Sequence, residues 1–232
     1  MMDATPSPRL AEIRAAQREA MGRLGLLDRP WVILGGAPQP TMPDELLAGH
    51  ARVDINNAGL AARQRGWGPA DLTVRRPVES WSAFPDLETR ALLWYNARPR
   101  WRQRWKLMRQ RRAKIGALVS LSPDDREAIN QALIGPEILG IGELGKPSTG
   151  IAALCYGLFL GVPEIVLAGF SFARAGHSYD ALARPRMQIP EDRHALQRLR
   201  QDPRVATTEP ELAADIGLRL WRPDGATPAG TG

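Results

Sequence analysis

A single cysteine, Cys155, occurs among the 232 residues of the chain, so no disulfide can form within it. This excludes a disulfide-stapled scaffold and a cysteine zinc site, and it fits a reducing compartment. No run of 18 apolar residues is present, so we expect no membrane-spanning helix. The start of the chain lacks an apolar stretch behind a positive segment, so we expect no secretory signal. These absences together predict a cytoplasmic protein.

Signatures of common nucleotide sites are missing as well. The stretch from Gly140 to Lys146 fits GxxxxGK, but Pro147 follows where a phosphate loop needs Ser or Thr to reach magnesium. The glycine turn at Gly35-Gly36 lacks the GxGxxG of a dinucleotide site. The sequence also contains no Asp-x-Asp, so it shows no carboxylate pair for the divalent cation that a diphosphate donor usually needs.

The net charge of +6 comes from one segment of the chain. Residues 98–114 contain nine of the 31 Lys and Arg and no acid, which leaves 22 basic against 25 acidic residues elsewhere, about −3. The apolar fraction of 44% and the charged fraction of 24% are ordinary for a globular protein. The sequence therefore describes a slightly acidic body with one basic segment, unlike a uniformly basic nucleic-acid binder.

Short apolar runs alternate with helical stretches. Ser7-Pro8 predicts the start of a helix over residues 8–24, and further helices are expected after Ser122-Pro123 and over 209–215. Strands are expected at residues 31–34, 52–56, 71–74, 115–121, 164–168 and 205–207. This alternation predicts one Rossmann-like α/β domain over residues 1–222, with a mostly parallel sheet flanked by helices. We expect residues 223–232 to form a disordered tail.

Ligands bind beyond the carboxyl ends of the strands in such sheets, so the site is expected in the segments that follow them. These segments are residues 35–40, 56–59 and 169–180. The helix start at 147–150 is a fourth, because Ser148 and Thr149 supply hydroxyls and Gly150 lets an anion approach the backbone N–H groups. An ordinary cap of a buried helix is the alternative for this last segment.

Several motifs resemble those of one enzyme family. PSTGIAALCYGLFLGVPEIVLAGF, which begins at Pro147, is similar to the small sialyl motif of the sialyltransferases related to the animal enzymes. WVILGGAP and RVDINNAGLAARQRGWGPADLTV resemble their large motif. His177-Ser178-Tyr179-Asp180 is similar to the third motif, and His194 lies where the last motif places its catalytic His. The resemblance covers residues 31–199.

The resemblance implies a GT-A-variant fold, a CMP-sugar donor and a glycan or glycolipid acceptor. The sugar would be sialic acid or a related ulosonic acid such as Kdo. His194 would be the general base, and His177 would serve the leaving phosphate together with Tyr179. The nucleotide would lie against the residues Gly35, Gly36, Ala37, Pro38, Asn56, Ser148, Thr149, Gly150 and Gly169.

The chemistry of the residues supports part of this assignment independently. The single phosphate of CMP can be met by a helix dipole, hydroxyls and His, so we expect a metal-independent enzyme without a cofactor. An inverting transfer through an oxocarbenium-like state needs a base for the acceptor hydroxyl, and His suits that task. The alternatives are a surface His on a helix for His194, a polar loop for His177 and a simple turn for Asn56.

One departure keeps a second function open. The family's last motif carries Glu five residues after its His, whereas this chain has Leu199 at that position. The absence of the family's paired disulfide cysteines, by contrast, is what we expect of a cytoplasmic bacterial-type member. A catalytically inactive nucleotide- or glycan-binding protein of the same fold is therefore the alternative.

The basic segment, residues 98–114, indicates a third property. Trp94, Trp101, Trp105 and Met108 fall at i, i+7, i+11 and i+14, the spacing of one helical face. A basic amphipathic helix with Trp favours peripheral contact with an anionic membrane, at its inner face for a cytoplasmic protein. This fits lipopolysaccharide or capsule biosynthesis. A solvated helix whose Trp side chains pack on the body is the alternative, and no recognition motif supports specific nucleic-acid binding.

Overall fold

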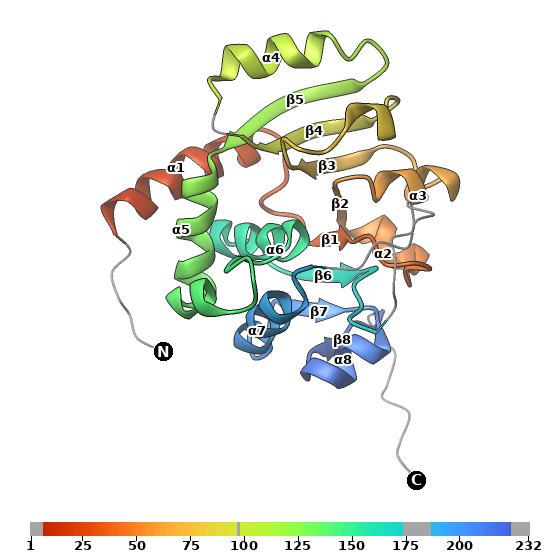
Figure 1. The fold of residues 1–232 in the computed structure, drawn as a ribbon. Helices are drawn as coiled ribbons and strands as arrows, with labels where there is room; N and C mark the ends of the chain where they lie inside the picture. The colour runs from red at the N-terminus through yellow and green to blue at the C-terminus, as the bar shows by residue number, and fades with distance from the viewer. Residues whose placement is uncertain (1–6, 97, 174–186, 224–232) are drawn as a thin grey trace.

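The computed structural model describes residues 7–96, 98–173 and 187–223, which form one α/β domain around an eight-stranded sheet (Figure 1). The strands are β1 (Trp31–Leu34), β2 (Ala51–Ile55), β3 (Ala70–Arg75), β4 (Glu88–Tyr95), β5 (Lys114–Leu121), β6 (Ile165–Ala168), β7 (Val205–Thr207) and β8 (Arg219–Leu220). The helices are α1 (Pro8–Gly22), α2 (Asp44–Gly49), α3 (Gly59–Gln64), α4 (Arg100–Met108), α5 (Pro123–Ile134), α6 (Thr149–Leu160), α7 (Ile189–Leu199) and α8 (Pro210–Ile216), with 3₁₀ turns η1 (Trp81–Ala83) and η2 (Pro136–Gly140).

The sheet is parallel throughout, in the order β5-β4-β3-β2-β1-β6-β7-β8. The chain runs outward from β1 to β5 and then returns to place β6 on the other side of β1. Leu34 pairs with Asp54 of β2 and with Ala168 of β6. The strand order therefore reverses between β1 and β6, which is the place where parallel α/β sheets bind ligands.

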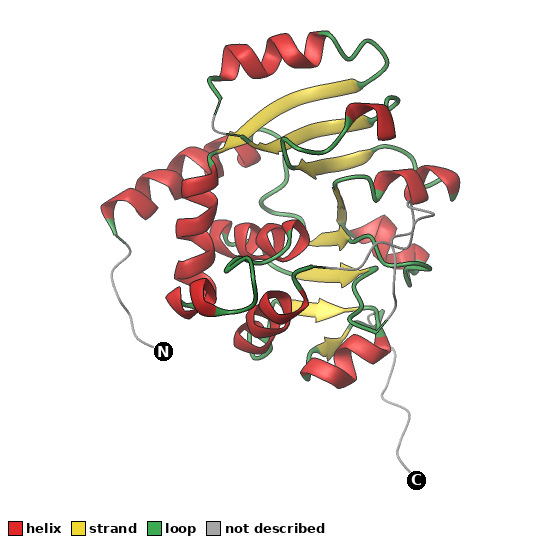
Figure 2. Cartoon of the chain, viewed as in Figure 1, coloured by secondary structure: helices red, strands yellow, loops and turns green. Residues whose placement is uncertain are grey.

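Helices cover both faces of the sheet (Figure 2). The larger hydrophobic core joins β1–β7 to α1, α5, α6, α7 and α8, and it includes Ile33, Leu93 and Leu167. On the other face, α2, α3, η1 and α4 pack in smaller clusters against the sheet. Helix α6 is almost fully buried. Its residues are apolar around the whole helix, which is the pattern of a helix that packs on all sides.

The six strands expected from the sequence are all present, each within one residue at either end. Ser7 and Ser122 cap α1 and α5 as the Ser-Pro pairs predict: their side-chain oxygens accept hydrogen bonds from Leu10 N and Asp125 N. Of the tail expected at residues 223–232, only Pro223 lies within the described residues. No helix in the described ranges is long and apolar enough to cross a bilayer.

The prediction for Trp94 was wrong. It lies in β4, not on a helical face shared with Trp101, and its indole is buried edge-on to Trp81, with ring centroids 5.8 Å apart. β4 was missed because it lies between β3 and β5 and its second half is buried on both faces. Such a strand has a continuous apolar run without alternation, so periodicity does not reveal it.

Candidate functional site

Two loops meet at the point where the strand order reverses. The backbone N–H of Gly35, directly after β1, donates to Ala168 O at 2.8 Å, and that of Ala37 donates to Gly169 O at 2.8 Å. Gly169 itself has φ +69°, a left-handed conformation that glycine adopts without strain. The glycine turn 35–38 and the segment after β6, which the sequence marks as two candidate segments, therefore form one unit.

Two glycines in this unit are needed for close packing. A Cβ on Gly35 would lie 2.5 Å from Gly169 O and 2.9 Å from the ring of Phe170. A Cβ on Gly150, in the first turn of α6, would lie 2.6 Å from the other side of that ring. Phe170 is buried and packs between the two glycines. The turn after β1, the segment after β6 and the start of α6 are thus brought together, as expected for Gly35, Gly150 and Gly169.

The start of α6 has the form of an anion-binding helix terminus. Ser148 is the N-cap, and its hydroxyl oxygen accepts a hydrogen bond from Ile151 N at 3.5 Å. The N–H groups of Thr149 and Gly150 lie in the first turn, where a helix offers them no acceptor. The helix dipole places partial positive charge at the same point. An anion that approaches this end would meet both the dipole and two donors.

Asn56 lies where β2 ends, in a left-handed conformation with φ 53°. Its N–H donates to Val74 O at 2.8 Å, and its side-chain oxygen accepts from Arg76 N at 3.4 Å. The structure therefore shows the turn that was the alternative reading of this residue. The neighbouring Asn57 is also buried, and its side-chain oxygen has no hydrogen-bond partner in the part of the chain that the structure describes.

Glu209, which the sequence analysis missed, holds the same loops together. This buried residue follows β7, and its Oε1 accepts hydrogen bonds from Gly169 N at 2.7 Å and Thr41 N at 3.0 Å. Its own N–H donates to Thr207 Oγ1 at 3.1 Å. The sequence contains a hint of this position, because Glu209 lies between the end of an expected strand and a proline that starts a helix.

His194 lies in the second turn of α7, and contacts fix that helix beside the start of α6. Asp192 Oδ1 accepts from Ser148 N at 2.7 Å, and Gln188 Nε2 donates to Pro147 O at 3.1 Å. The buried Glu191 accepts from Leu144 N at 2.9 Å. His194 Nε2 is buried and has no hydrogen-bond partner among the described residues. The helix that carries the expected base is therefore joined to the expected anion site.

The remaining site predictions divide into three groups. Gly36 and Pro38 lie in the loop after β1 with the other members of the turn. His177 and Tyr179 lie outside the described residues, so their roles stay predictions. Leu199, where the resemblance expects Glu, is buried in the hydrophobic core at the end of α7.

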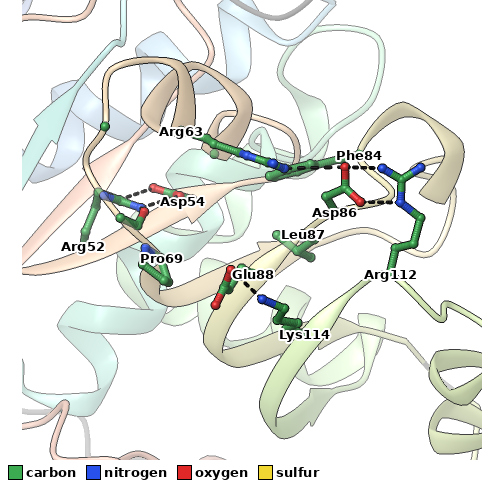
Figure 3. A pocket seen from close by; sticks show the side chains of 13 residues that line it. Arg52, Asp54, Arg63, Pro69, Phe84, Asp86, Leu87, Glu88, Arg112 and Lys114 are labelled. Carbon is green, nitrogen blue, oxygen red and sulfur yellow. Dashed lines mark hydrogen bonds and ion pairs between the residues drawn. The ribbon is translucent and has the colours of Figure 1, made fainter.

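A cavity of about 450 Å³ lies elsewhere, under α3 and toward the amino ends of β4 and β5 (Figure 3). All seven charged residues that line it belong to ion pairs. Arg52 pairs with Asp54, and Glu88 pairs with Lys114. Asp86 pairs with both Arg63 and Arg112. Burial raises the pKa of Asp54 against the opposing effect of Arg52. We assign no ligand to this cavity, because its charges are compensated internally.

No protein-family model matches the chain, and no curated protein matches it either. Solved structures do. The sialyltransferase CstII from Campylobacter jejuni in complex with a substrate analogue, CMP-3FNeuAc, is 15% identical, with 83% of this chain and 86% of that chain covered and a TM-score of 0.51. A Tyr-to-Phe variant of CST-II in complex with CMP is 13% identical, with 86% and 88% covered and a TM-score of 0.53.

The chain has the fold of these sialyltransferases. Monomeric CstII gives the same result at 14% identity and a TM-score of 0.50, with 82% of this chain and 86% of that chain covered. At such identities the likeness establishes the architecture alone, a single α/β domain built on a parallel sheet. The residues of this chain must carry the argument about chemistry.

Proposed function

We propose that the protein is a glycosyltransferase that uses a CMP-sugar donor. The observation that carries the proposal is the glycine-lined junction of Gly35, Gly150 and Gly169, which lies at the strand-order reversal and abuts the start of α6. Solved structures of the same fold are described as complexes with CMP and with a CMP-sugar analogue. The sugar transferred is sialic acid or a related ulosonic acid such as Kdo, and the acceptor is a glycan or glycolipid.

In this proposal the phosphate of CMP meets the Thr149 and Gly150 N–H groups and the positive end of the α6 dipole. The nucleoside lies along the Gly35–Pro38 turn and Gly169, near Asn56, whose amide can donate to a base or ribose. The ring of Phe170 forms the apolar floor beneath it. His177 and Tyr179 serve the same phosphate, as the resemblance implies.

The transfer itself requires one bond to break and one to form. The bond between the anomeric carbon and the phosphate oxygen breaks, and its electron pair leaves with CMP. The acceptor oxygen attacks the oxocarbenium-like carbon from the opposite side, which inverts its configuration. His194 takes the proton of that acceptor hydroxyl, and the N–H groups of α6 stabilise the charge that develops on the phosphate.

We propose that the reaction needs no metal ion. A CMP leaving group has one phosphate charge, which the helix terminus can meet, whereas a diphosphate usually needs a cation held by carboxylates. The sequence has no Asp-x-Asp to supply them. Turnover should therefore persist in EDTA. Loss of turnover on chelation, with recovery on adding manganese or magnesium, would overturn this part of the proposal.

The experiment that tests the function has two steps. A thermal-shift panel of CMP, CDP, UDP and NAD should show stabilisation by CMP above the others. Turnover is then measured with CMP-sialic acid and CMP-Kdo, first as donor hydrolysis and then with glycan acceptors. If CMP binds without turnover, the protein is the inactive binding protein. This function is the second candidate because the buried Leu199 stands where the resemblance expects Glu. No response to CMP would reject both.

A further inference from the structure

We propose that α4 docks the protein on an anionic lipid bilayer, with Trp101, Trp105 and Met108 inserted at the interface. These three side chains are 65%, 57% and 77% exposed. They fall at i, i+4 and i+7, so they form one stripe along the helix. Large apolar side chains that gather on an exposed helix face mark an interaction surface. The inference is independent of the proposed transferase activity.

The opposite face of α4 fixes the direction of the stripe. Gln103 is 1% exposed; its Nε2 donates to Arg98 O at 2.7 Å, and its Oε1 accepts from Ser120 Oγ of β5 at 2.8 Å. One turn later, Leu107 packs against the cluster around Trp94. Half a helical turn separates this anchored face from the stripe, so the stripe points away from the sheet. Figure 1 shows α4 beyond the edge strand β5.

Most charges around the stripe have no ion-pair partner within the described residues. Among the residues that the structure describes, only Arg112 and Lys114 of the basic segment form ion pairs, with Asp86 and Glu88. The other seven cations form no ion pair in the described part of the chain; they are Arg98, Arg100, Arg102, Arg104, Lys106, Arg109 and Arg111. Arg102 and Arg109 stack over the rings of Trp101 and Trp105 at 5.0 and 4.5 Å. Cations thus border both exposed tryptophans.

This arrangement suits a bilayer better than the other possible occupants. Tryptophan favours the headgroup level of a membrane, and cations beside it meet anionic headgroups there. A symmetric contact between two copies of α4 would set seven cations against seven, which is repulsive. A nucleic acid would need phosphates over the centre of the surface, which is apolar here. Anionic lipids gather in the cytoplasmic leaflet, so the inner membrane face is the proposed location.

The test is co-sedimentation of the full chain with vesicles. Vesicles of phosphatidylglycerol mixed with phosphatidylcholine should bind the protein at 0.1 M NaCl, and pure phosphatidylcholine should not. Binding should weaken strongly at 0.5 M NaCl, because screening shortens the reach of surface charge. Tryptophan emission should shift to the blue on binding. Equal binding to both vesicle types, or binding indifferent to salt, overturns the proposal.

Variants separate the apolar and the charged contributions. The double variant Trp101→Ser with Trp105→Ser should bind vesicles at least about tenfold more weakly, because it removes the inserted rings and keeps every charge. Arg104→Gln with Arg111→Gln should weaken binding roughly 25-fold, from about fivefold per cation. The matched control is Arg14→Gln with Arg200→Gln, two exposed residues away from α4, which should leave binding nearly unchanged.

Further measurements distinguish a lipid bilayer from a nucleic acid or a second copy of the chain. Circular dichroism confirms that the variants fold, and CMP binding reports on the proposed active site separately. If the tryptophan variant binds vesicles as the parent does, the proposal fails. If the parent prefers a single-stranded RNA over anionic vesicles and the variant loses that preference, the surface is a nucleic-acid site instead. If the parent dimerises and the variant does not, the stripe is an interface between copies.

Discussion

Glu209 Oε1 lies 2.7 Å from the backbone nitrogen of Gly169 and accepts its hydrogen bond. The same oxygen accepts from Thr41 N, so one carboxylate at the end of β7 joins the loops that follow β1 and β6. These loops contain the glycines of the candidate nucleotide site. Glu209 is therefore a positioning residue, and the geometry of the site depends on a side chain that need not touch the nucleotide.

Glu209→Ala should lower both stability and CMP affinity. Removing the carboxylate leaves the buried N–H of Gly169 without an acceptor, which costs about 1–3 kcal/mol. Urea unfolding measures the first effect and calorimetric titration with CMP the second. Glu12→Ala, on the exposed side of α1, is the control and should change neither. A fully stable Glu209→Ala that binds CMP as the parent does would remove the positioning role.

Gly35→Ala tests the close approach of the β1 and β6 loops. Its Cβ would lie 2.5 Å from a backbone oxygen, which cannot move aside cheaply. We expect a loss of roughly 1–3 kcal/mol in unfolding free energy and weaker CMP binding. Gly49→Ala is the matched control, since nothing lies within 4 Å of its Cβ position. In that helical position alanine should be neutral or slightly stabilising. Equal behaviour of the two variants in thermal melts would contradict the packing argument.

Asn56 needs two variants, because the residue has a strained backbone as well as an amide. Asn56→Ala removes the amide and also places alanine at φ 53°, a conformation that costs roughly 1–2 kcal/mol. Asn56→Gly removes the amide without that steric cost. CMP affinity should fall in both variants, whereas stability should fall more in Asn56→Ala. Undiminished CMP affinity in Asn56→Gly would show that the residue only builds the turn.

The sequence predicted the strands around the site well, because each buried strand is bounded by glycine, proline or polar residues. It also placed Gly35, Gly150 and Gly169 together, since parallel strands end at one edge. The position of Glu209 after an expected strand could be seen in the sequence, but its hydrogen-bond partners and the α6–α7 contacts could not be predicted in this way. They join residues about 40 positions apart or more, such as Ser148 and Asp192, and depend on how helices pack after the sheet has formed.

The basic segment shows a second limit of periodicity. Spacing alone assigned Trp94 to the same face as Trp101, yet Trp94 lies in β4 and Trp101 lies in α4. A spacing of seven is consistent with a helix but does not require one. Inside α4 the same reasoning was correct, because Trp101, Trp105 and Met108 do share an exposed face.

Stability should depend on pH through Glu164, which lies before β6. Burial alone would raise the pKa of this carboxyl, but hydrogen bonds from Arg219 and His50 lower it below its ordinary 4.5. A carboxylate with a lowered folded pKa stabilises the protein above its unfolded pKa, and the effect is lost as pH falls through the folded value. Glu164→Gln should therefore destabilise by about 1 kcal/mol at pH 7 and much less at pH 3.

Urea unfolding of the parent and of Glu164→Gln, at pH 7 and at pH 3, checks this prediction. Glu88→Gln is the control, because its partner Lys114 lies 3.5 Å away and both side chains are at least half exposed. The Glu88→Gln variant should lose less than about 0.5 kcal/mol of unfolding free energy at either pH. A penalty for Glu164→Gln that stays constant from pH 7 to pH 3 would mean that the charge of Glu164 does not matter.

His194 is the proposed base, and its substitution should separate chemistry from binding. A base acts on the acceptor proton and not on the nucleotide, so His194→Ala should keep CMP affinity while transfer falls about 10²- to 10⁴-fold. The acidic limb of the pH–rate profile should disappear with it, because protonation of a missing base cannot slow the reaction. Gln197→Ala, exposed on the same helix, is the matched control and should retain transfer.

His177→Ala, by contrast, should weaken both CMP binding and transfer, because the phosphate is present in the ground state and the transition state. If the two phenotypes were reversed, the roles of the histidines would have to be exchanged. If neither substitution changed transfer, the base would have to be a carboxylate. Glu191 is then the candidate within α7: it lies one turn before His194, it is fully buried, and its Oε2 has no hydrogen-bond partner in the described ranges. Glu191→Gln would then remove the acidic limb of the pH–rate profile that His194→Ala had left in place.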